Sequence, residues 1–507
     1  MGRQPRADPA RFGGCCRLAH CPFVTELEPI NLVWLKRDLR LTDHAPLADA
    51  ATRPEPLSLI YCFEPELLDD PHYDERHWRF IWQSLDDLDR VLAPLGGKVH
   101  RLWGSVTALL EEIDRSRPVA GLFSHQETGL AVTFERDKAV ADWCRTRGVP
   151  WHESPTGAVQ RGLPDRRRWD RDWYRTLGAA PQDPELERIR WVVLPEDLGS
   201  GTAPESWCRE NPAFQRGGIR TARQTLASFL EHRGRDYRRA ISSPSASREH
   251  CSRLSPYLAW GNLSLRQVYQ ATLERRQAPG WRYPLTAFSS RLHWHCHFIQ
   301  KFESECAMEH RPVNRAYEAF PYRTDDRVED DLQAWREGQT GIPLVDACMR
   351  CLHQTGYINF RMRAMLVSVL CHHLNIDWRR GVTHLARLFL DFEPGIHYPQ
   401  FQMQAGVTGV NTIRIYNPVR QAEQQDADGT FTRQWLPELA ELPVPLLHQP
   451  WALAPMERMM FDLAYPEPIV DLTEAARAAR ERLWGWRNRV EVKREGQRVL
   501  GRHVRPS

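Results

Sequence analysis

Two arginines and two carboxylates in the C-terminal half of the chain stand where charges are unusual. Arg361 and Arg363 fall in the first turn of a helix predicted over about residues 359–373, where a cation gains nothing from the helix dipole. Asp391 and Glu393 follow a later apolar run and could supply an anionic partner. Because a charge inside an apolar environment must be paired, these residues predict a buried ionic site.

Two helices with a tight break between them are predicted to position these charges. Pro343 stands where the first helix would begin, and Gly356 stands where it would end. Between them, apolar residues at helical spacing predict a buried stripe: Leu344, Ala347, Cys348, Cys351 and Leu352. Cys348 and Cys351 have C-x-x-C spacing, which could indicate a metal or an iron–sulfur cluster. Their place in the middle of a buried helix favours structural thiols, and no metal site is expected.

The pattern of apolar segments predicts a chain of several parts. Residues 30–160 alternate short apolar runs with helical stretches, which predicts a parallel α/β domain. Residues 161–214 are rich in Arg, Pro, Asp and Trp and predict a long surface linker, while residues 215–475 predict an all-helical domain. Residues 1–29 lack periodicity and are expected to be disordered or a mis-called start. Residues 476–507 form a basic tail, either a solvated end or a nucleic-acid contact.

Composition limits the classes of function. The net charge of a 507-residue chain is only +3, so any affinity for nucleic acid must come from a local patch. No run of about 18 apolar residues occurs, so no membrane span is expected. The 12 cysteines accompany no secretory signal, which predicts a reducing cytoplasm rather than a disulfide framework. The α/β domain has no GxGxxG or Walker signature, so no dinucleotide is placed there.

Three long motifs carry a resemblance to the photolyase and cryptochrome family. GIPLVDACMR, TGY, RMR, IDWRRG and RIYNP resemble the flavin-binding core of that family. NLVWLKRDLRLTDHAPL resembles its opening strand and loop, and CSRLSPYLAWGNLSLRQ resembles its flavin diphosphate segment. The motifs occur in the family's order, and the resemblance covers residues 30–475. It implies a parallel five-stranded sheet with helices, a long linker and a large all-helical domain that binds FAD.

The resemblance also implies the residues that contact FAD. Ser255 would be a helix N-cap and Pro256 the first helical residue, next to the diphosphate. Arg363 would face the isoalloxazine ring, with Asp391 as its partner and Glu393 where a second Asp usually accepts from the ring. The implied FAD contacts are Tyr237, Cys251, Ser252, Arg253, Leu254, Ser255, Phe288, Arg363, Asp391, Phe392 and Glu393.

The chemistry residues depart from the family's pattern. His397 aligns with the position that faces flavin N5, and its imidazole, which titrates near neutrality, would alter the proton supply to the ring. Trp378 matches the middle member of the family's chain of three Trp residues. Phe401 occupies the flavin-proximal place and no Trp matches the outer one, so this route looks broken. The residues expected to take part in the chemistry are Trp378, Trp294, His397 and Phe401.

The DNA pocket departs from the pattern as well. Trp294 matches a pocket Trp, but Arg291 stands where a Glu is usual, Phe360 replaces an Asn, and Met403 replaces a second Trp. The implied DNA contacts are Arg291, Trp294, His295, Phe360, Arg361 and Met403. Three histidines surround Trp294 in the sequence, but on a helix they spread around the axis and do not predict a metal.

The resemblance implies two functions. The first is repair, as by a deoxyribodipyrimidine photolyase: reduced FAD excited by blue light donates an electron to a flipped-out pyrimidine dimer. The second is a cryptochrome-type photoreceptor without repair activity, in which light reorders a segment such as the tail. Thr133 stands where a folate-binding member has Glu, which leaves a flavin, a deazaflavin or no antenna chromophore. The expected partner is DNA with UV lesions, and the chain is expected to be a cytoplasmic monomer.

Overall fold

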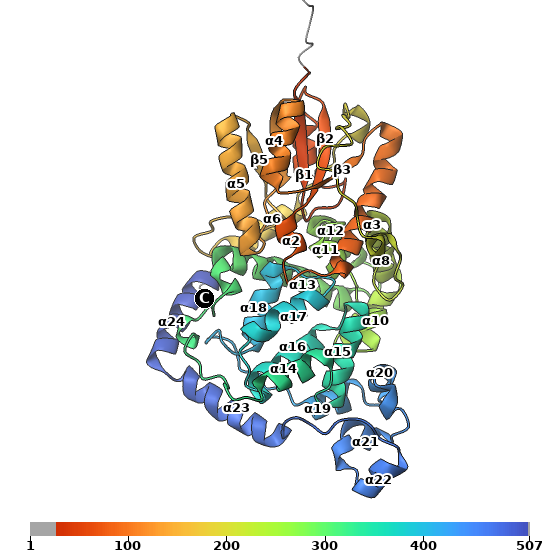
Figure 1. The fold of residues 1–507 in the computed structure, drawn as a ribbon, viewed down its shortest axis with the longest axis vertical. Coiled ribbons are helices and arrows are strands. Elements are labelled where there is room, and N and C mark those ends of the chain that lie inside the picture. The colour runs from red at the N-terminus through yellow and green to blue at the C-terminus, as the bar shows by residue number, and fades with distance from the viewer. Residues whose placement is uncertain (1–26, 505–507) are drawn as a thin grey trace, which may run out of the picture.

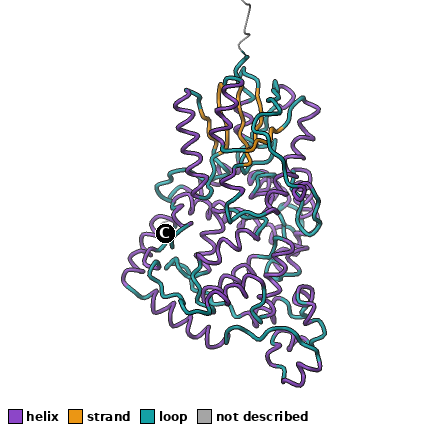
Figure 2. Tube along the Cα trace, in the orientation of Figure 1, coloured by secondary structure: helices purple, strands orange, loops and turns teal. Residues whose placement is uncertain are grey.

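The computed structural model of this protein describes residues 27–504, so the expectation for residues 1–29 lies almost entirely outside the described residues. A sheet with its helices stands at one end, and a larger helical part forms the other (Figures 1 and 2). No helix in the described range is long and apolar enough to cross a bilayer.

The sheet has five parallel strands, as predicted. Its spatial order is β3-β2-β1-β4-β5, and it is built from β1 (Ile30–Leu35), β2 (Leu57–Phe63), β3 (Val99–Trp103), β4 (Val119–His125) and β5 (Trp151–Ser154). Helices cover both faces, which explains why β1 and β2 are buried throughout and mostly apolar. The order reverses between β1 and β4, so the loops at their carboxyl ends border a crevice where α/β sheets bind ligands. The helices of this part are α1 (Ala45–Ala50), α2 (Pro65–Leu68), α3 (Glu75–Leu92), α4 (Val106–Ser116) and α5 (Ala131–Arg147).

The segment predicted as a surface linker packs more closely than expected. Its helices are α6 (Trp169–Gly178) and α7 (Glu205–Cys208), and Trp169 and Trp173 of α6 are buried. Trp191 forms a parallel bridge with Leu57 at the start of β2. The tryptophans that marked this segment as unusual therefore attach it to the rest of the molecule.

The second part is helical, as predicted. Helix α15 begins at Pro343 and ends before Gly356, which is left-handed (φ 68°), so both predicted boundaries are confirmed. Helix α16 is capped by Asn359 and runs into a π turn at Val369–His373. The helices from residue 215 to the tail are α8 (Ile219–Glu231), α9 (Tyr237–Ala240), α10 (Ala246–His250), α11 (Ser255–Ala259), α12 (Leu265–Arg275), α13 (Arg282–Ser304), α14 (Val328–Glu337), α15 (Pro343–Thr355), α16 (Phe360–Ser368), α17 (Arg379–Leu388), α18 (Pro394–Gln404), α19 (Pro418–Gln425), α20 (Thr430–Trp435), α21 (Val444–His448) and α22 (Pro455–Met460).

The basic C-terminal segment is not a free tail through residue 504. It forms α23 (Leu472–Arg487) and α24 (Val490–His503), which bury Leu483, Trp486 and Val499 against the helical part. Glu305 anchors the last helix, because its carboxylate lies 3.0 Å from Arg498 and 2.8 Å from His503. The basic residues of the segment therefore occupy the outer faces of amphipathic helices.

Candidate functional site

A cavity bordered by α16, α17 and α18 gathers the predicted chemistry residues; we call it the Arg363 cavity. It encloses about 580 Å³ of empty space, part of it open to solvent. Seven residues predicted from the sequence line it: Phe360, Arg363, Asp391, Phe392, Glu393, His397 and Phe401. Residues from two predicted helices and the loop between α17 and α18 therefore meet in one place.

The predicted ion pair between Arg363 and Asp391 is present. Nη2 of Arg363 lies 3.0 Å from each carboxylate oxygen of Asp391, and Nε donates to the carbonyl of Ile358 at 3.0 Å. The guanidinium also stacks over the ring of Phe389, 3.9 Å from its centroid. Its orientation is therefore fixed from three sides before any ligand enters.

Glu393 has a partner that the sequence did not indicate. Nε of Arg37, in the loop after β1, lies 3.5 Å from the Glu393 carboxylate and donates to the carbonyl of Ala259 at 3.1 Å. Arg37 also donates to the carbonyl of Phe392. Burial raises the pKa of Glu393, and the charge of Arg37 opposes that rise. The α/β part thus supplies a cation to the edge of the Arg363 cavity.

His397 lines the cavity as a neutral imidazole. Its Nε2 lies 2.8 Å from the carbonyl of Val382, so Nε2 carries the proton and Nδ1 is left as an acceptor. Burial lowers the pKa of His397 to about 3. The expectation that this side chain titrates near neutrality is therefore wrong, because the surrounding apolar residues exclude the charged form.

The predicted diphosphate segment lies beside the cavity and is surrounded by arginines. Arg253 has a left-handed backbone (φ 59°), and its guanidinium stacks 3.4 Å from the centroid of the Tyr357 ring. Nη1 of Arg253 is buried without a hydrogen-bond partner. Arg233 donates to the carbonyl of Ser252 at 3.2 Å, and Arg248 donates to the carbonyl of Tyr357 at 3.3 Å.

Among the residues that the structure describes, no carboxylate pairs with Arg233, Arg248 or Arg253. A phosphate group fits a buried guanidinium that has a free donor and no anionic partner. Burial also lowers the pKa of Arg253, because no carboxylate in the described range pairs with its charge. Sequence reasoning missed Arg233 and Arg248, which lie outside the matched motifs. The helix start differs by one residue from the prediction: α11 begins at Ser255, so Leu254 is the N-cap and no side chain caps the helix.

Two further predicted FAD contacts, Tyr237 and Phe288, pack against each other. The rings of Tyr237 and Phe288 are 5.7 Å apart and nearly perpendicular. Burial raises the pKa of Tyr237, while Cys251 and Arg291 act on it as close neighbours. The Arg291 assigned to DNA is thus placed next to the Tyr237 assigned to FAD.

Phe360, Trp294 and Met403, which stand at or near the family's DNA-pocket positions, differ in their surroundings. Only Phe360, which is 44% exposed, lines the Arg363 cavity. Trp294 is also 44% exposed, but its ring packs against His297 and Phe298 on the surface of α13. Met403 stays partly buried on α18, and Nη1 of Arg361 donates to Gln421 at 3.3 Å.

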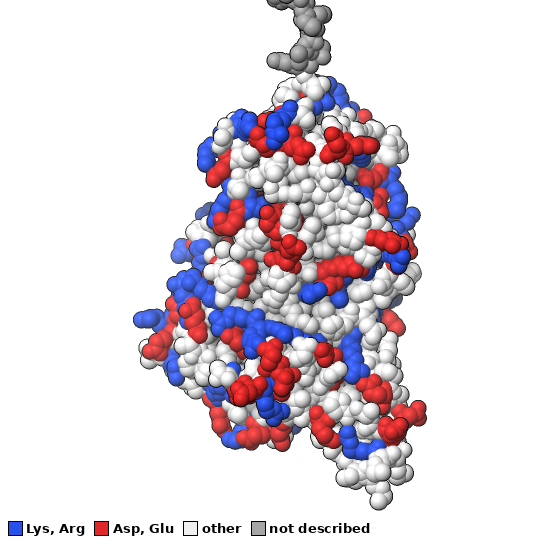
Figure 3. Space-filling view, in the orientation of Figure 1, with Lys and Arg blue, Asp and Glu red and all other residues white. Residues whose placement is uncertain are grey.

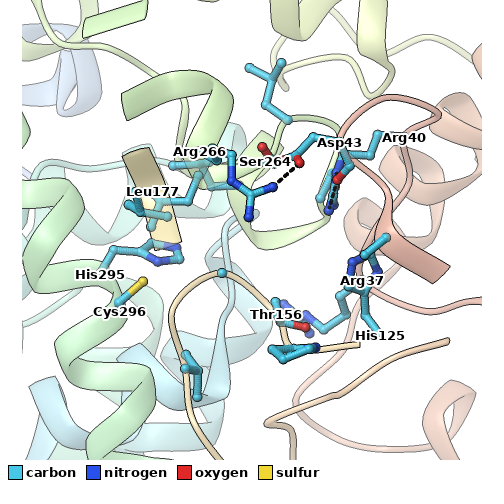
Figure 4. Close-up of a pocket in the computed structure, with 18 of the residues that line it drawn as sticks. Arg37, Arg40, Asp43, His125, Thr156, Leu177, Ser264, Arg266, His295 and Cys296 are labelled. Carbon is cyan, nitrogen blue, oxygen red and sulfur yellow. Dashed lines mark hydrogen bonds and ion pairs between the residues drawn. The ribbon is translucent and has the colours of Figure 1, made fainter. Parts of the chain in front are cut away.

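His295 lies in a different cavity from the one predicted; we call this the His295 cavity (Figure 4). It encloses about 680 Å³ of empty space, partly open to solvent, between the loop after β1, α12 and α13. Nδ1 of His295 is buried there without a partner, and burial lowers the pKa of the imidazole to about 4. His295 thus faces the α/β part, whereas its neighbour Trp294 on α13 is 44% exposed.

Arginines supply most of the charge of the His295 cavity. Arg266 pairs with Asp43, and Arg40 donates to the carbonyls of Asp43 at 3.0 Å and Gly261 at 3.3 Å. Arg37 lines the cavity as well. Three cations and one carboxylate give it a positive balance that suits an anionic ligand.

Asp38, His44 and His125 form a buried cluster that was not predicted, since His125 is brought from β4 to two residues of the loop after β1. The carboxylate of Asp38 lies 3.0 Å from Nε2 of His44 and 2.6 Å from Nδ1 of His125. Their ligand atoms are close enough for a metal ion. However, Nδ1 of His44 accepts from the backbone of Leu47 at 3.1 Å, so Nε2 carries the proton that faces Asp38. Burial alone would raise the pKa of Asp38, but the two histidines hold it well below its ordinary value. Asp38 is therefore hydrogen-bonded to His125, whereas Nε2 of His44 lies beside the carboxylate without hydrogen-bond geometry.

Trp378 is buried beside the cavity without lining it. It is 1% exposed, and its ring lies 6.4 Å from Phe401 and 6.5 Å from Tyr398. Phe401, which lines the cavity, thus lies between Trp378 and the cavity.

Known proteins of one family match both parts of the chain. A family profile described as "FAD binding domain of DNA photolyase" matches residues 288–485, and one described as "DNA photolyase" matches residues 31–160. A deoxyribodipyrimidine photo-lyase of Streptomyces griseus is 33% identical over 360 residues, 69% of this chain and 73% of that protein. A cryptochrome DASH of Synechocystis is 27% identical over 487 residues, 89% of this chain and 97% of its own.

Solved structures show the same fold. The crystal structure of a Synechocystis cryptochrome superposes with a TM-score of 0.80 at 25% identity, covering 90% of this chain and 99% of that one. An archaeal photolyase from Sulfolobus tokodaii, described as containing two FAD molecules, superposes with a TM-score of 0.73 at 23% identity, covering 90% and 100% of the two chains.

Proposed function

Because this chain belongs to the photolyase and cryptochrome family and carries its FAD-binding domain, we propose that it repairs pyrimidine dimers in DNA with blue light, as a deoxyribodipyrimidine photolyase does. The observation that carries the proposal is the Arg363 cavity, with its fixed Arg363–Asp391 pair beside an unpaired buried cation, Arg253. FAD, when bound, supplies the absorption of blue light and the transferable electron.

The protein's own residues would hold and orient the cofactor. Arg253 and Arg248 would bind its diphosphate, since a planar guanidinium can donate two parallel hydrogen bonds to phosphate oxygens. Arg233 would add positive charge and hold the segment, because its donors go to Ser228 and to backbone carbonyls. Arg363 would set the charge next to the ring, and Asp391 keeps that arginine in place. Phe360 at the cavity wall is half exposed and would meet a base flipped out of the duplex.

A second chromophore would fit the His295 cavity, whose arginines favour an anionic group. The presence of two FAD molecules in the Sulfolobus structure supports looking for one here. DNA would be held by local contacts, because acidic and basic side chains are interspersed on the face drawn in Figure 3. We propose further that the protein acts as a monomer in the cytoplasm.

The test is lesion loss from dimer-containing single-stranded and double-stranded DNA, with the cofactor fully reduced. Repair predicts that dimers disappear in blue light and persist in the dark. No loss in light, with FAD bound, would contradict repair and leave the photoreceptor function. The photoreceptor function is favoured because the chain departs from the family's pattern at the lesion-pocket residues. It predicts a light-dependent change in the protease sensitivity of α23 and α24.

A further inference from the structure

A tyrosine, a histidine and an aspartate form a hydrogen-bonded chain close to the Arg363 cavity. The hydroxyl of Tyr398 lies 2.6 Å from Nε2 of His72, and Nδ1 of His72 lies 2.7 Å from a carboxylate oxygen of Asp70. Tyr398 and His72 are buried, whereas the side chain of Asp70 is 16% exposed and reaches solvent. Tyr398 belongs to α18 and His72 to the loop between α2 and α3, so the chain connects the two parts of the molecule.

The direction of each hydrogen bond follows from the chemistry of the groups. A carboxylate can only accept, so Asp70 holds the proton of His72 on Nδ1, and it also accepts from the His72 backbone at 2.9 Å. Nε2 of His72 is therefore unprotonated and accepts from the Tyr398 hydroxyl. Glu309, the other acidic side chain that acts on both His72 and Tyr398, accepts from the backbone of Ala131 at 2.6 Å. An imidazolium at His72 would thus remain paired with Asp70.

Tyr398 also belongs to a set of aromatic rings around the cavity. Its ring centroid lies 6.5 Å from Trp378 and 5.8 Å from His397. Trp378 in turn lies 6.4 Å from Phe401, and both His397 and Phe401 line the cavity. Trp378 and Tyr398 each stand one ring away from the cavity, and they contact one another.

We propose that Tyr398, with His72 as its proton acceptor, is the terminal electron donor of a two-member chain, Trp378 and Tyr398, that serves the cofactor of the Arg363 cavity. The inference rests on the proposed function, because it concerns how the reduced cofactor that repair needs would be formed: light-excited oxidised FAD would be the one-electron oxidant. Trp378 loses one electron to that oxidant. Tyr398 then gives one electron to the oxidised Trp378, and the phenolic proton of Tyr398 passes to Nε2 of His72.

The products are an intact Trp378, a neutral phenoxyl radical at Tyr398 and an imidazolium at His72 beside Asp70. A thiolate from solution then gives Tyr398 one electron, becoming a thiyl radical, and His72 returns the proton. Tyr398 thereby takes the place of the missing outer Trp, and the electron passes from Trp378 to the cofactor beyond Phe401, which is much harder to oxidise than tyrosine or tryptophan. Once the phenol proton has moved to His72, the radical at Tyr398 is neutral. Transfer of an electron back from Trp378 to Tyr398 then requires the proton to return from His72.

The test is transient absorption and electron paramagnetic resonance of the flavin-bound protein after a blue flash. Wild type should show a tryptophan radical followed by a neutral tyrosyl radical. Tyr398→Phe should lose the tyrosyl signal, and His72→Gln should slow its formation about 100-fold, the usual worth of a positioned base. Tyr317→Phe is the matched control, because Tyr317 is 1% exposed and its hydroxyl has no partner.

Flavin-free protein provides a second readout. One-electron oxidation of tryptophan by azide radicals should pass to tyrosine in wild type and less so in Tyr398→Phe at equal folded fraction. If the flash produces tryptophan radicals but the tyrosyl signal is unchanged in Tyr398→Phe, the inference is overturned while the proposed function stands. If the protein binds no flavin, the proposed function fails, and the azide comparison alone decides whether Tyr398 donates to tryptophan.

Discussion

Arg37 and Glu393 are separated by more than 350 residues and meet at the edge of the Arg363 cavity, with Nε of the arginine 3.5 Å from the carboxylate. Both side chains are 12% exposed. The pair joins the loop after β1 to the loop before α18, so the α/β part helps to set the charge of a site built mainly from helices.

Removing Arg37 should make stability fall as pH rises. Burial already raises the pKa of Glu393, and loss of the opposing cation in Arg37→Gln should raise it further. Because the folded state then holds its proton more tightly than the unfolded state, unfolding free energy should decrease as pH rises above the ordinary range of a glutamate. Urea unfolding at pH 5 and pH 8 should show a loss that is larger at pH 8, up to about 3–5 kcal/mol. Adding Glu393→Gln should remove the difference between the two pH values; an unchanged difference would show that the effect lies elsewhere.

Arg253→Gln should weaken FAD binding without destabilising the empty protein. The guanidinium is buried with a free donor and no carboxylate, so the empty protein gains nothing from its charge. Loss of a charge-assisted hydrogen bond, worth about 1.5–3 kcal/mol, should weaken FAD binding by about 10–100-fold. Flavin fluorescence titration measures the affinity, and Arg239→Gln, at an exposed position, is the control. Equal affinity in the two variants would exclude Arg253 from the diphosphate site.

Glu305 should make the last helix sensitive to acid. Burial would raise its pKa, but hydrogen bonds from His503 and Arg498 lower it to about 2. Its folded-state pKa is therefore below the unfolded value, so its contribution is present above about pH 4.5 and is lost as pH falls toward 2. Limited proteolysis should show α24 released in acid, and Glu305→Gln should release it at neutral pH. Equal protection of wild type and variant across this range would contradict the role.

His397 should stay neutral across the working range of the protein. Since burial lowers its pKa to about 3, nitrogen NMR of labelled histidine should show the Nε2-protonated neutral form from pH 5 to pH 8. A titration in that window would contradict the burial argument. His397→Asn keeps a donor for the carbonyl of Val382 and should fold like wild type.

The sequence predicted features whose causes are local. Pro343 and Gly356 mark α15 because proline favours the first turn and glycine tolerates the left-handed ending. The Arg363–Asp391 pair could also be predicted from the sequence, because charged residues in apolar segments require partners. The parallel sheet followed from alternating strand and helix patterns, together with the resemblance.

Features set by distant contacts could not be predicted in this way. The contacts of Arg37 with Glu393 and of His72 with Tyr398 join residues more than 300 positions apart, and no local pattern encodes them. The start of α11 moved by one residue because Arg253 adopts a left-handed backbone, which propensity does not favour. The cavity that His295 lines could not be predicted either, because alignment gives a helix position but not the neighbour that its face meets.

The most direct test of the account is the absorption spectrum and cofactor content of the purified protein, wild type beside Arg363→Ala and Arg253→Gln. The account predicts a blue-absorbing flavin in wild type that is released as FAD on denaturation, in an amount at least equimolar with the chain, and a reduced amount in both variants. Wild-type protein that folds, remains colourless and takes up no added FAD would contradict it.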